Sequence, residues 1–271
     1  MSRKKVGLAL SSGAARGLAH LGVLTQLQKR GVPIDMITGT SIGAIVGALY
    51  AAGKDVPEIA GELAELSWRG VISLANLALP SHGFIKSRRI TQWLRKIIGD
   101  IDFKDLKIPF ACVATDVGTC TEVVMKEGSV AEAVSASACI PVIFTPSNWQ
   151  GRYLVDGALI NPMPVRLLRD MGAELVIAVN VVPYISDRLQ KAQNCNPGMP
   201  NIFSVLLRTI QVVGYQAVLA SMREADVTIT PDVAHIRPDN FGRVRECISR
   251  GKTATELAFP EIQNQLKSLE V

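Results

Sequence analysis

A serine and an aspartate stand in two short motifs that could together carry out acyl-transfer chemistry. Ser41 lies in the sequence Gly-Thr-Ser-Ile-Gly, between a short apolar run and a long one. A Gly-x-Ser-x-Gly motif between a strand and a helix is the pattern of a nucleophile elbow, in which a sharp turn exposes the serine hydroxyl. The alternative is that Ser41 only caps a helix, and that Gly39 and Gly43 permit close packing. The motif by itself leaves both interpretations open.

The second motif is Leu-Val-Asp-Gly-Ala, in which Asp156 ends an apolar run and Gly157 follows it. Sites in α/β sheets assemble at the carboxyl ends of strands. A carboxylate there can accept a serine proton directly if apolar surroundings raise its pKa toward the working pH. The alternative is an Asx-turn, in which Asp156 accepts hydrogen bonds from backbone N–H groups of its own turn. Taken alone, the motif favours the Asx-turn.

A histidine is the usual base for a nucleophilic serine, and the chain has three histidines. His235 follows Asp156, so the chain order Ser, Asp, His of α/β-hydrolases is formally present. However, the serine motif follows only about the second predicted strand, and no turn glycine flanks His235. His20 is expected to cap or pack on the first helix, and His82 to lie in a polar loop. The histidines are therefore weaker candidates for the base.

A third motif, Ser-Ser-Gly-Ala-Ala-Arg-Gly at residues 11–17, joins the first predicted strand to a helix. Backbone N–H groups of such a turn can bind an anion at the helix N-terminus. The spacing of Gly13 and Gly17 does not match a dinucleotide fingerprint, and the motif lacks the ending of a P-loop. An oxyanion hole for Ser41 is physically reasonable, because consecutive strands bring their following turns together. Arg16 either pins the loop, binds an anionic head group or is simply solvated.

Short β-branched runs alternate with helical patterns along the chain, which predicts an α/β fold with a sheet between helices. Ser87 is the expected N-cap of one helix. Strands are predicted at 5–10, 34–38, 108–117, 120–128, 152–159, 175–181 and 226–231. Helices are predicted at 18–30, 42–53, from about 57, 87–100, 130–141, 202–224 and at the C-terminus, with a loop at 190–201.

The composition is that of a globular protein, with 48% hydrophobic and 20% charged residues among 271. No 18-residue stretch is free of charged and strongly polar residues, so we predict no transmembrane span. The five cysteines are scattered without a Cys-x-x-Cys pair, so neither a metal site nor a disulfide framework is expected. We expect one domain over residues 1–271, no cofactor, and a cytoplasmic protein, either free or peripheral at the inner membrane surface.

Two helices raise the question of a lipid partner. The net charge of +5 favours anionic surfaces. The segment 87–100 is basic and amphipathic and carries Trp93, as membrane-surface helices do, but a core-packed helix with a solvated face is the favoured interpretation. The segment 202–222 is apolar nearly all round, and is therefore deeply buried, a cover over an acyl site or a dimer contact. The oligomeric state stays open.

Together, the three motifs resemble the patatin-like phospholipase family. The resemblance covers most of the chain, including the segments 39–53, 135–146, 154–165 and 224–233. It implies a three-layer α/β/α fold with a central, mostly parallel sheet. It also implies a Ser–Asp dyad without a histidine, with Ser41 as the nucleophile and Asp156 as the general base. The backbone N–H groups of Ser12, Gly13 and Ala14 would bind the oxyanion, with Arg16 and Gly17 closing the motif.

The family's loop is usually richer in glycine, of the form Gly-Gly-Gly-x-Arg-Gly, whereas serine and alanine occupy positions 11, 12 and 14 here. Backbone donors do not require glycine unless φ is positive. The resemblance therefore implies a serine esterase acting on phospholipids, lysophospholipids or related acyl esters. The alternative is a non-catalytic lipid-binding or regulatory protein with the same fold. An acyltransferase ranks third, because Thr40 stands where its elbow histidine is expected, and no feature indicates nucleic-acid binding.

Overall fold

A computed structural model describes residues 3–65, 87–183 and 202–267. Its strands are β1 Val6–Leu10, β2 Met36–Gly39, β3 Phe110–Asp116, β4 Thr121–Met125, β5 Ser147–Trp149, β6 Arg152–Asp156, β7 Leu175–Val179 and β8 Val227–Ile229. Its α-helices are α1 Ala19–Lys29, α2 Ile42–Ala51, α3 Val56–Glu65, α5 Arg88–Ile98, α6 Val130–Ser137, α7 Val165–Asp170, α9 Ile202–Glu224 and α10 Val244–Lys267. Its 3-10 helices are η1 Ala14–Leu18, η3 Phe103–Asp105, η4 Gly157–Leu159 and η5 Phe241–Arg243.

The strands form one mixed sheet in the order β5-β6-β3-β2-β1-β7-β8, and β4 pairs with β3. The neighbours from β3 through β2, β1 and β7 to β8 are parallel, whereas β4, β5 and β6 join by antiparallel pairing. This arrangement confirms the predicted α/β fold with a mostly parallel sheet.

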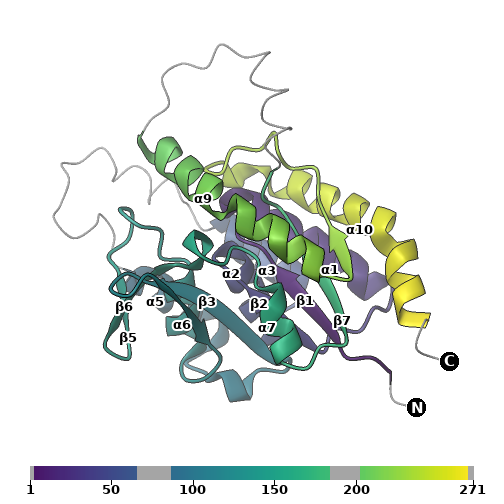
Figure 1. Ribbon diagram of the computed structural model, residues 1–271, viewed down its shortest axis with the longest axis horizontal. Helices are drawn as coiled ribbons and strands as arrows, with labels where there is room; N and C mark the ends of the chain where they lie inside the picture. The colour runs from purple at the N-terminus through teal and green to yellow at the C-terminus, as the bar shows by residue number, and fades with distance from the viewer. Residues whose placement is uncertain (1–2, 66–86, 184–201, 268–271) are drawn as a thin grey trace, which may run out of the picture.

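Helices cover both faces of the sheet (Figure 1). Alternate residues of a strand point to opposite faces, and β1 shows the consequence. Leu8 and Leu10 pack into the large apolar core that α1, α2, α6 and α10 complete. Ala9 points the other way, into a smaller core formed with Val165 of α7 and Val218 of α9. Both faces of the central strands are therefore buried, as their continuous apolar sequences require.

The pairing of β3 brings the carboxyl ends of β2 and β6 close together. The first half of β3 pairs with β2, with Cys112 opposite Gly39. Its second half pairs with β6, with Ala114 opposite Asp156. Because β4 pairs with both halves of β3, it occupies the other side of that strand. Since β2 is parallel and β6 antiparallel to β3, the carboxyl ends of β2 and β6 point at each other.

Several sequence predictions need correction in detail. The second strand begins at Met36 rather than at residue 34, and β5 was not predicted at all. Three residues without strong alternation, such as those of β5, carry too little pattern to be found. Ser87 precedes α5 as predicted, but its hydroxyl makes no capping hydrogen bond. His82 and the predicted loop at 190–201 lie outside the described residues.

The two helices considered as lipid contacts are packed on the protein. On α5, Ile90 and Leu94 are buried, and Trp93 packs against the core, so the favoured core-packed interpretation is confirmed. On α9, Val218 is buried, whereas Val212 is 60% exposed. This helix is therefore half-buried rather than enclosed.

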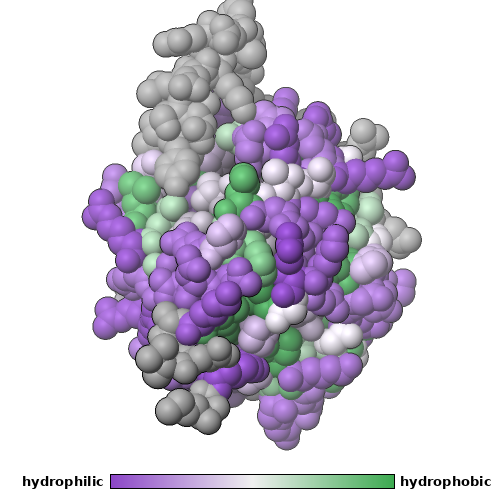
Figure 2. Space-filling view, turned by 90° about the vertical axis from the view of Figure 1, so that its right-hand side faces the viewer, coloured by the Kyte–Doolittle hydropathy of each residue, from purple (hydrophilic) through white to green (hydrophobic). Residues whose placement is uncertain are grey.

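The surface beside α10 offers no broad apolar face. In Figure 2 that side is covered mainly by hydrophilic side chains, with hydrophobic ones confined to narrow strips. Within the described ranges, no helix combines the length and the apolar character needed to cross a membrane.

Candidate active site

Ser41 occupies a strained turn between β2 and α2. Its backbone angles are φ 56° and ψ −121°, although it is not a glycine. Such a conformation is uncommon for a residue with a side chain and persists only where the surroundings over-determine it. The Ser41 hydroxyl makes no cap hydrogen bond with α2, so the simple helix-cap interpretation is wrong. The turn has the form of a nucleophile elbow.

Close backbone approaches explain the glycines of the elbow. A Cβ on Gly39 would lie 2.5 Å from the carbonyl oxygen of Gly43, and one on Gly43 would overlap the carbonyl oxygen of Leu10. These obstacles are backbone atoms, which cannot move aside as a flexible side chain can. Gly157 meets the same limit at the carbonyl oxygen of Val113. The motif therefore allows α2 to pack directly against the ends of β1 and β2.

Asp156 uses its two carboxylate oxygens for two different partners. The Ser41 hydroxyl donates to Oδ2 at 2.6 Å. The backbone N–H of Ala158 donates to Oδ1 at 2.9 Å. The Asx-turn interpretation is therefore confirmed, and the same turn orients the carboxylate so that its other oxygen faces the serine.

Burial gives Asp156 the proton affinity that a base requires near neutral pH. The residue is only 3% exposed. Desolvation raises the pKa of its carboxyl to about 6, against the opposing effect of the hydrogen bonds from Ser41 and Ala158. A buried carboxylate is costly to ionise, so its affinity for a proton rises. Above this pH the carboxylate can accept the serine proton.

The loop after β1 lies against the elbow. The strands β1 and β2 are parallel neighbours, and the N–H of Thr40 donates to the carbonyl oxygen of Leu10 at 3.2 Å. Gly13 has φ 156° and ψ 6°, and Ala14 has φ 51°, so consecutive residues leave the usual backbone regions. Within the described part of the chain, the N–H groups of these two residues donate to no other residue. They are therefore available to an anion.

The prediction that Ser12 contributes a backbone N–H to the oxyanion hole is wrong. Its backbone N–H donates to the carbonyl oxygen of Pro162 at 2.8 Å and so is not available to an oxyanion. The neighbouring Ser11 hydroxyl accepts the N–H of Val181 at 3.0 Å. The backbone of Ser12 and the hydroxyl of Ser11 thus tie the loop to the segments after η4 and β7.

Arg16 and Gly17 hold the far end of the loop. Arg16 is only 6% exposed, and its Nε donates to the carbonyl oxygen of Ile236 at 2.7 Å. The solvated interpretation of this arginine is therefore wrong, and the pinning interpretation is confirmed. A Cβ on Gly17 would overlap the side chain of Ile42, the first residue of α2. The loop and the elbow consequently form one packed unit.

The described histidines are bonded away from Ser41. The ring Nε2 of His20 lies 2.8 Å from the carbonyl oxygen of Ser11, and burial lowers the pKa of this imidazole to about 4. It is therefore neutral at physiological pH. His235 is paired with the carboxylate of Glu246 at 2.5 Å. The hydroxyl of Ser41 faces a carboxylate instead.

Three hydroxyls that the sequence interpretation assigned no role support the site. The Ser41 N–H donates to Oγ of Ser137, at the end of α6, at 3.0 Å. Thr115 Oγ1 donates to the carbonyl oxygen of Asp156 at 3.0 Å. Thr40 Oγ1 donates to the carbonyl oxygen of Asn161 at 2.8 Å. In the sequence, the small residues of the segment 130–141 were the one indication that this helix, α6, could approach the backbone of Ser41 so closely.

A cavity of about 820 Å³ adjoins the turn that carries Asp156. Its walls come from the end of β3 and the turn after it, from the segment between α6 and β5, from β6, and from the end of η4 with the residue that follows it. Its lining residues are mostly apolar, namely Thr115, Asp116, Val117, Cys120, Pro141, Val142, Phe144, Thr145, Pro146, Tyr153, Val155, Leu159 and Ile160. Both neighbours of the Asp156–Gly157–Ala158 turn, Val155 and Leu159, are among them. The volume is in the range of small-molecule binding sites.

The fold and the site together define a class of protein. It is an α/β protein whose serine, on a strained strand-to-helix turn, donates to a buried carboxylate beside backbone N–H groups of a neighbouring turn. A family model described as "Patatin-like phospholipase" matches residues 8–169, which include every residue of the predicted site. The chain belongs to the patatin-like phospholipase family.

Curated proteins from other organisms show sequence similarity to this chain. An uncharacterized NTE family protein of Mycobacterium bovis is 36% identical over 180 residues, which cover 66% of this chain and 50% of that protein. A protein named lysophospholipase NTE1 of Lodderomyces elongisporus is 27% identical over 301 residues, covering 100% of this chain and 20% of that protein. The chain thus spans half or less of the length of these curated relatives.

Solved structures show the same fold at low identity. VipD from Legionella pneumophila superposes with a TM-score of 0.57 at 15% identity, covering 98% of this chain and 67% of that chain. Human GIVD cytosolic phospholipase A2 gives a TM-score of 0.50 at 10% identity, covering 97% of this chain and 63% of that chain. At these identities the likeness concerns the fold alone.

Proposed function

We propose that this protein is a serine hydrolase that cleaves carboxylic ester bonds of phospholipids, lysophospholipids or related acyl esters. Ser41 is the nucleophile and Asp156 the general base. The observation that carries the proposal is the hydrogen bond of 2.6 Å from the Ser41 hydroxyl to the buried Asp156 carboxylate. A nucleophile and a base within hydrogen-bond reach, the base itself oriented by a third group, are the signature of covalent catalysis. The family assignment and the apolar cavity support an acyl substrate.

The reaction runs through an acyl-enzyme. Asp156 Oδ2 accepts the proton of the Ser41 hydroxyl while Oγ attacks the ester carbonyl carbon. The N–H groups of Gly13 and Ala14 stabilise the negative charge that develops on the carbonyl oxygen. The bond to the leaving alcohol then breaks, and Asp156 returns the proton to that alcohol. Asp156 next takes a proton from a water molecule, whose oxygen attacks the acyl carbon. As the bond between that carbon and Ser41 Oγ breaks, Asp156 gives this proton to Oγ, which releases the fatty acid and restores the free serine.

A fluorophosphonate probe tests the nucleophile directly. Intact-mass spectrometry is expected to show one adduct on the wild type and none on Ser41→Ala. Ser135→Ala is a matched control, because Ser135 is also buried but donates to the carbonyl oxygen of Ser87, away from Asp156. It should be labelled like the wild type. A folded wild-type protein that takes no label and hydrolyses no acyl ester would favour the non-catalytic lipid-binding protein instead.

The pH dependence of hydrolysis should report the ionisation of Asp156. Because the base must be deprotonated, kcat/KM is expected to be level above its pKa of about 6 and to fall about tenfold per pH unit below it. The measurement is kcat/KM for a soluble p-nitrophenyl ester between about pH 4.5 and about pH 8. His235→Ala should leave this profile unchanged. A profile that shifts in that variant would make the histidine, rather than Asp156, the titrating base.

A further inference from the structure

Three exposed apolar side chains surround the mouth of the cavity beside Asp156. Val117, Val142 and Tyr153 all line the cavity, and they are 50%, 53% and 61% exposed. They come from three different segments: the turn after β3, the turn after α6, and β6. Exposed apolar side chains that gather at one place are typical of an interaction surface, whereas scattered ones are ordinary. We call these three residues the mouth residues.

Val142, one of the mouth residues, has a strained backbone conformation. Val142 has φ 71°, a conformation that is a genuine outlier for a β-branched residue. It follows Pro141, in the turn position where glycine or asparagine usually supplies the positive φ. An observed strain of this kind is a reason to look for a function. Here it presents an apolar side chain to the surroundings.

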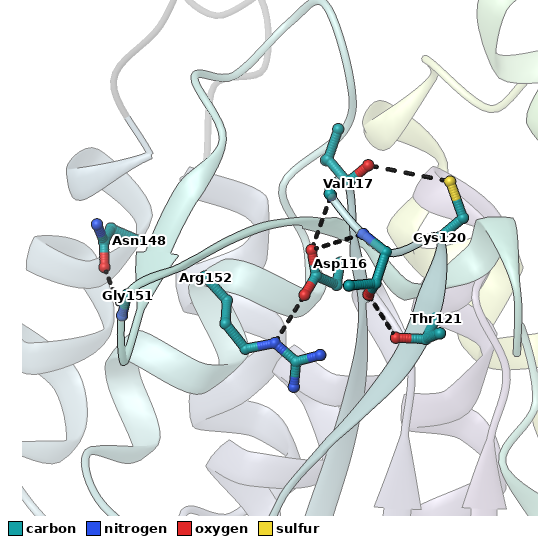
Figure 3. A network of polar contacts seen from close by, with 9 residues as sticks. Asp116, Val117, Cys120, Thr121, Asn148, Gly151 and Arg152 are labelled. Atoms are coloured by element: carbon teal, nitrogen blue, oxygen red, sulfur yellow. Dashed lines mark hydrogen bonds and ion pairs between the residues drawn. The ribbon is translucent and has the colours of Figure 1, made fainter.

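The guanidinium of Arg152 is fixed beside Asp116, a residue that lines the same cavity (Figure 3). Arg152 Nε donates to Asp116 Oδ2 at 2.6 Å. The Asp116 carboxylate is held in turn by the N–H groups of Gly118 at 2.8 Å and of Thr119 at 3.4 Å. The Arg152 side chain is 45% exposed, and its two terminal nitrogens, drawn without a partner in Figure 3, bond to no described residue. They keep their N–H donors for an external anion.

We propose that this mouth is the surface by which the protein binds a lipid membrane. The mouth residues insert among acyl chains, and the free end of the Arg152 guanidinium binds lipid phosphate. Neighbouring residues of a strand point to opposite sides, so Arg152 and Tyr153 flank β6 rather than sharing the cavity. The guanidinium is therefore placed for phosphates of the surrounding surface. On this proposal, lipid substrate enters the cavity directly from the membrane, and that step rests on the proposed function.

A lipid surface fits these observations better than a second copy of the chain. Interfacial binding combines buried apolar area with attraction to anionic lipids, and tyrosine and arginine are suited to the boundary between the apolar and polar layers. The mouth offers both kinds of group around an open, apolar cavity. The +5 net charge of the chain has the sign that anionic lipid requires.

Co-sedimentation with vesicles tests the proposal, with Ser41→Ala as the background so that no lipid is consumed. Vesicles are made of phosphatidylcholine alone or of equal parts phosphatidylcholine and phosphatidylglycerol. Tyr153→Ser should lower the partition coefficient on both kinds by about tenfold. Arg152→Gln should lower it about fivefold on the anionic vesicles, the ratio expected for a single basic residue. The loss should be smaller on phosphatidylcholine alone, where choline offsets the charge of the phosphate.

Matched controls are available elsewhere on the molecule. Leu257→Ser removes a 79% exposed apolar side chain from α10. Arg30→Gln removes an arginine of similar exposure, 42%, which is paired with Glu256. Both controls should bind vesicles like the background protein. Equal losses in the controls and in the mouth variants would overturn the proposal.

Val142→Asn separates the proposal from a general loss of folding. Asparagine tolerates positive φ, so this variant should raise the melting temperature while lowering vesicle binding about fivefold or more. Unchanged binding would contradict the proposal. So would mouth variants that keep vesicle binding but turn a dimer into a monomer in light scattering, which would make the mouth a contact between copies.

If vesicles bind but Ser41 takes no fluorophosphonate, the proposed hydrolase activity fails and the docking surface stands. If Ser41 is labelled but no vesicle binds, only the docking surface fails.

Discussion

Asp156→Asn is expected to lower kcat/KM for ester hydrolysis by between about 100-fold and about 10,000-fold, the range that a positioned general base contributes. The asparagine has nearly the same shape, and its oxygen can still accept the N–H of Ala158 that Asp156 Oδ1 accepts now. Its amide nitrogen would then donate to Ser41 Oγ, where Asp156 Oδ2 accepts a proton. The hydroxyl therefore keeps a partner but loses the group that takes its proton.

The same substitution should stabilise the fold at neutral pH. The pKa of the Asp156 carboxyl is raised from 3.8 to about 6 in the folded protein. Between these two pKa values the Asp156 carboxyl is ionised in the unfolded chain but still protonated in the folded protein. The free energy of unfolding of the wild type therefore falls as the pH rises from about 4 to about 6. Above that window the loss amounts to roughly 3 kcal/mol. A neutral amide in place of this carboxyl carries no such penalty, so the variant's advantage in the free energy of unfolding should appear over this window and persist at about pH 7.5.

Two measurements on one variant therefore have opposite expected signs. Steady-state hydrolysis gives the loss of activity, and urea unfolding at about pH 4 and about pH 7.5 gives the gain in stability. A drop in both would mean that the variant is misfolded rather than deprived of its base. Full activity in a stable Asp156→Asn protein would contradict the dyad and return His235 to consideration.

Gly13→Ala is expected to lower kcat by about 100-fold, which is the effect of losing an oxyanion donor. A Cβ at this position would lie 2.5 Å from Val181 Cγ2, and its φ of 156° belongs to a region that L side chains rarely adopt. The loop must therefore move, and the N–H groups of Gly13 and Ala14 move with it. KM should change much less than kcat, because these donors act on charge that develops only in the transition state.

Gly172→Ala is the matched control for backbone strain. Gly172 also has a positive φ, 94°, but nothing lies within 4 Å of the position that its Cβ would take. Both variants should lose about 1 to 3 kcal/mol of stability, and only Gly13→Ala should lose activity. Measuring kcat and thermal unfolding for both variants distinguishes the loss of an oxyanion donor from a general loss of stability. A Gly13→Ala protein with a wild-type kcat would show that the loop does not bind the oxyanion.

Most of the fold and the central pair of the site could be predicted from the sequence. The central strands are buried on both faces, so they appear as continuous apolar runs between helical patterns. The elbow and the Asx-turn are local structures, made by glycine, serine and aspartate over a few neighbouring residues. Short antiparallel pieces such as β5 could not be predicted, because three residues carry no usable periodicity.

By itself, then, the sequence determined Ser41 and Asp156 as candidates, together with the loop that faces them, because turn chemistry acts over short stretches of chain. Only the tertiary structure decided which backbone donors remain available and how the pair is supported. Ser12 gives its N–H to Pro162, Arg16 is buried against Ile236, and Ser137 accepts the N–H of Ser41. These partners lie between about a hundred and more than two hundred residues away along the chain, and only the order of strands in the sheet brings them together.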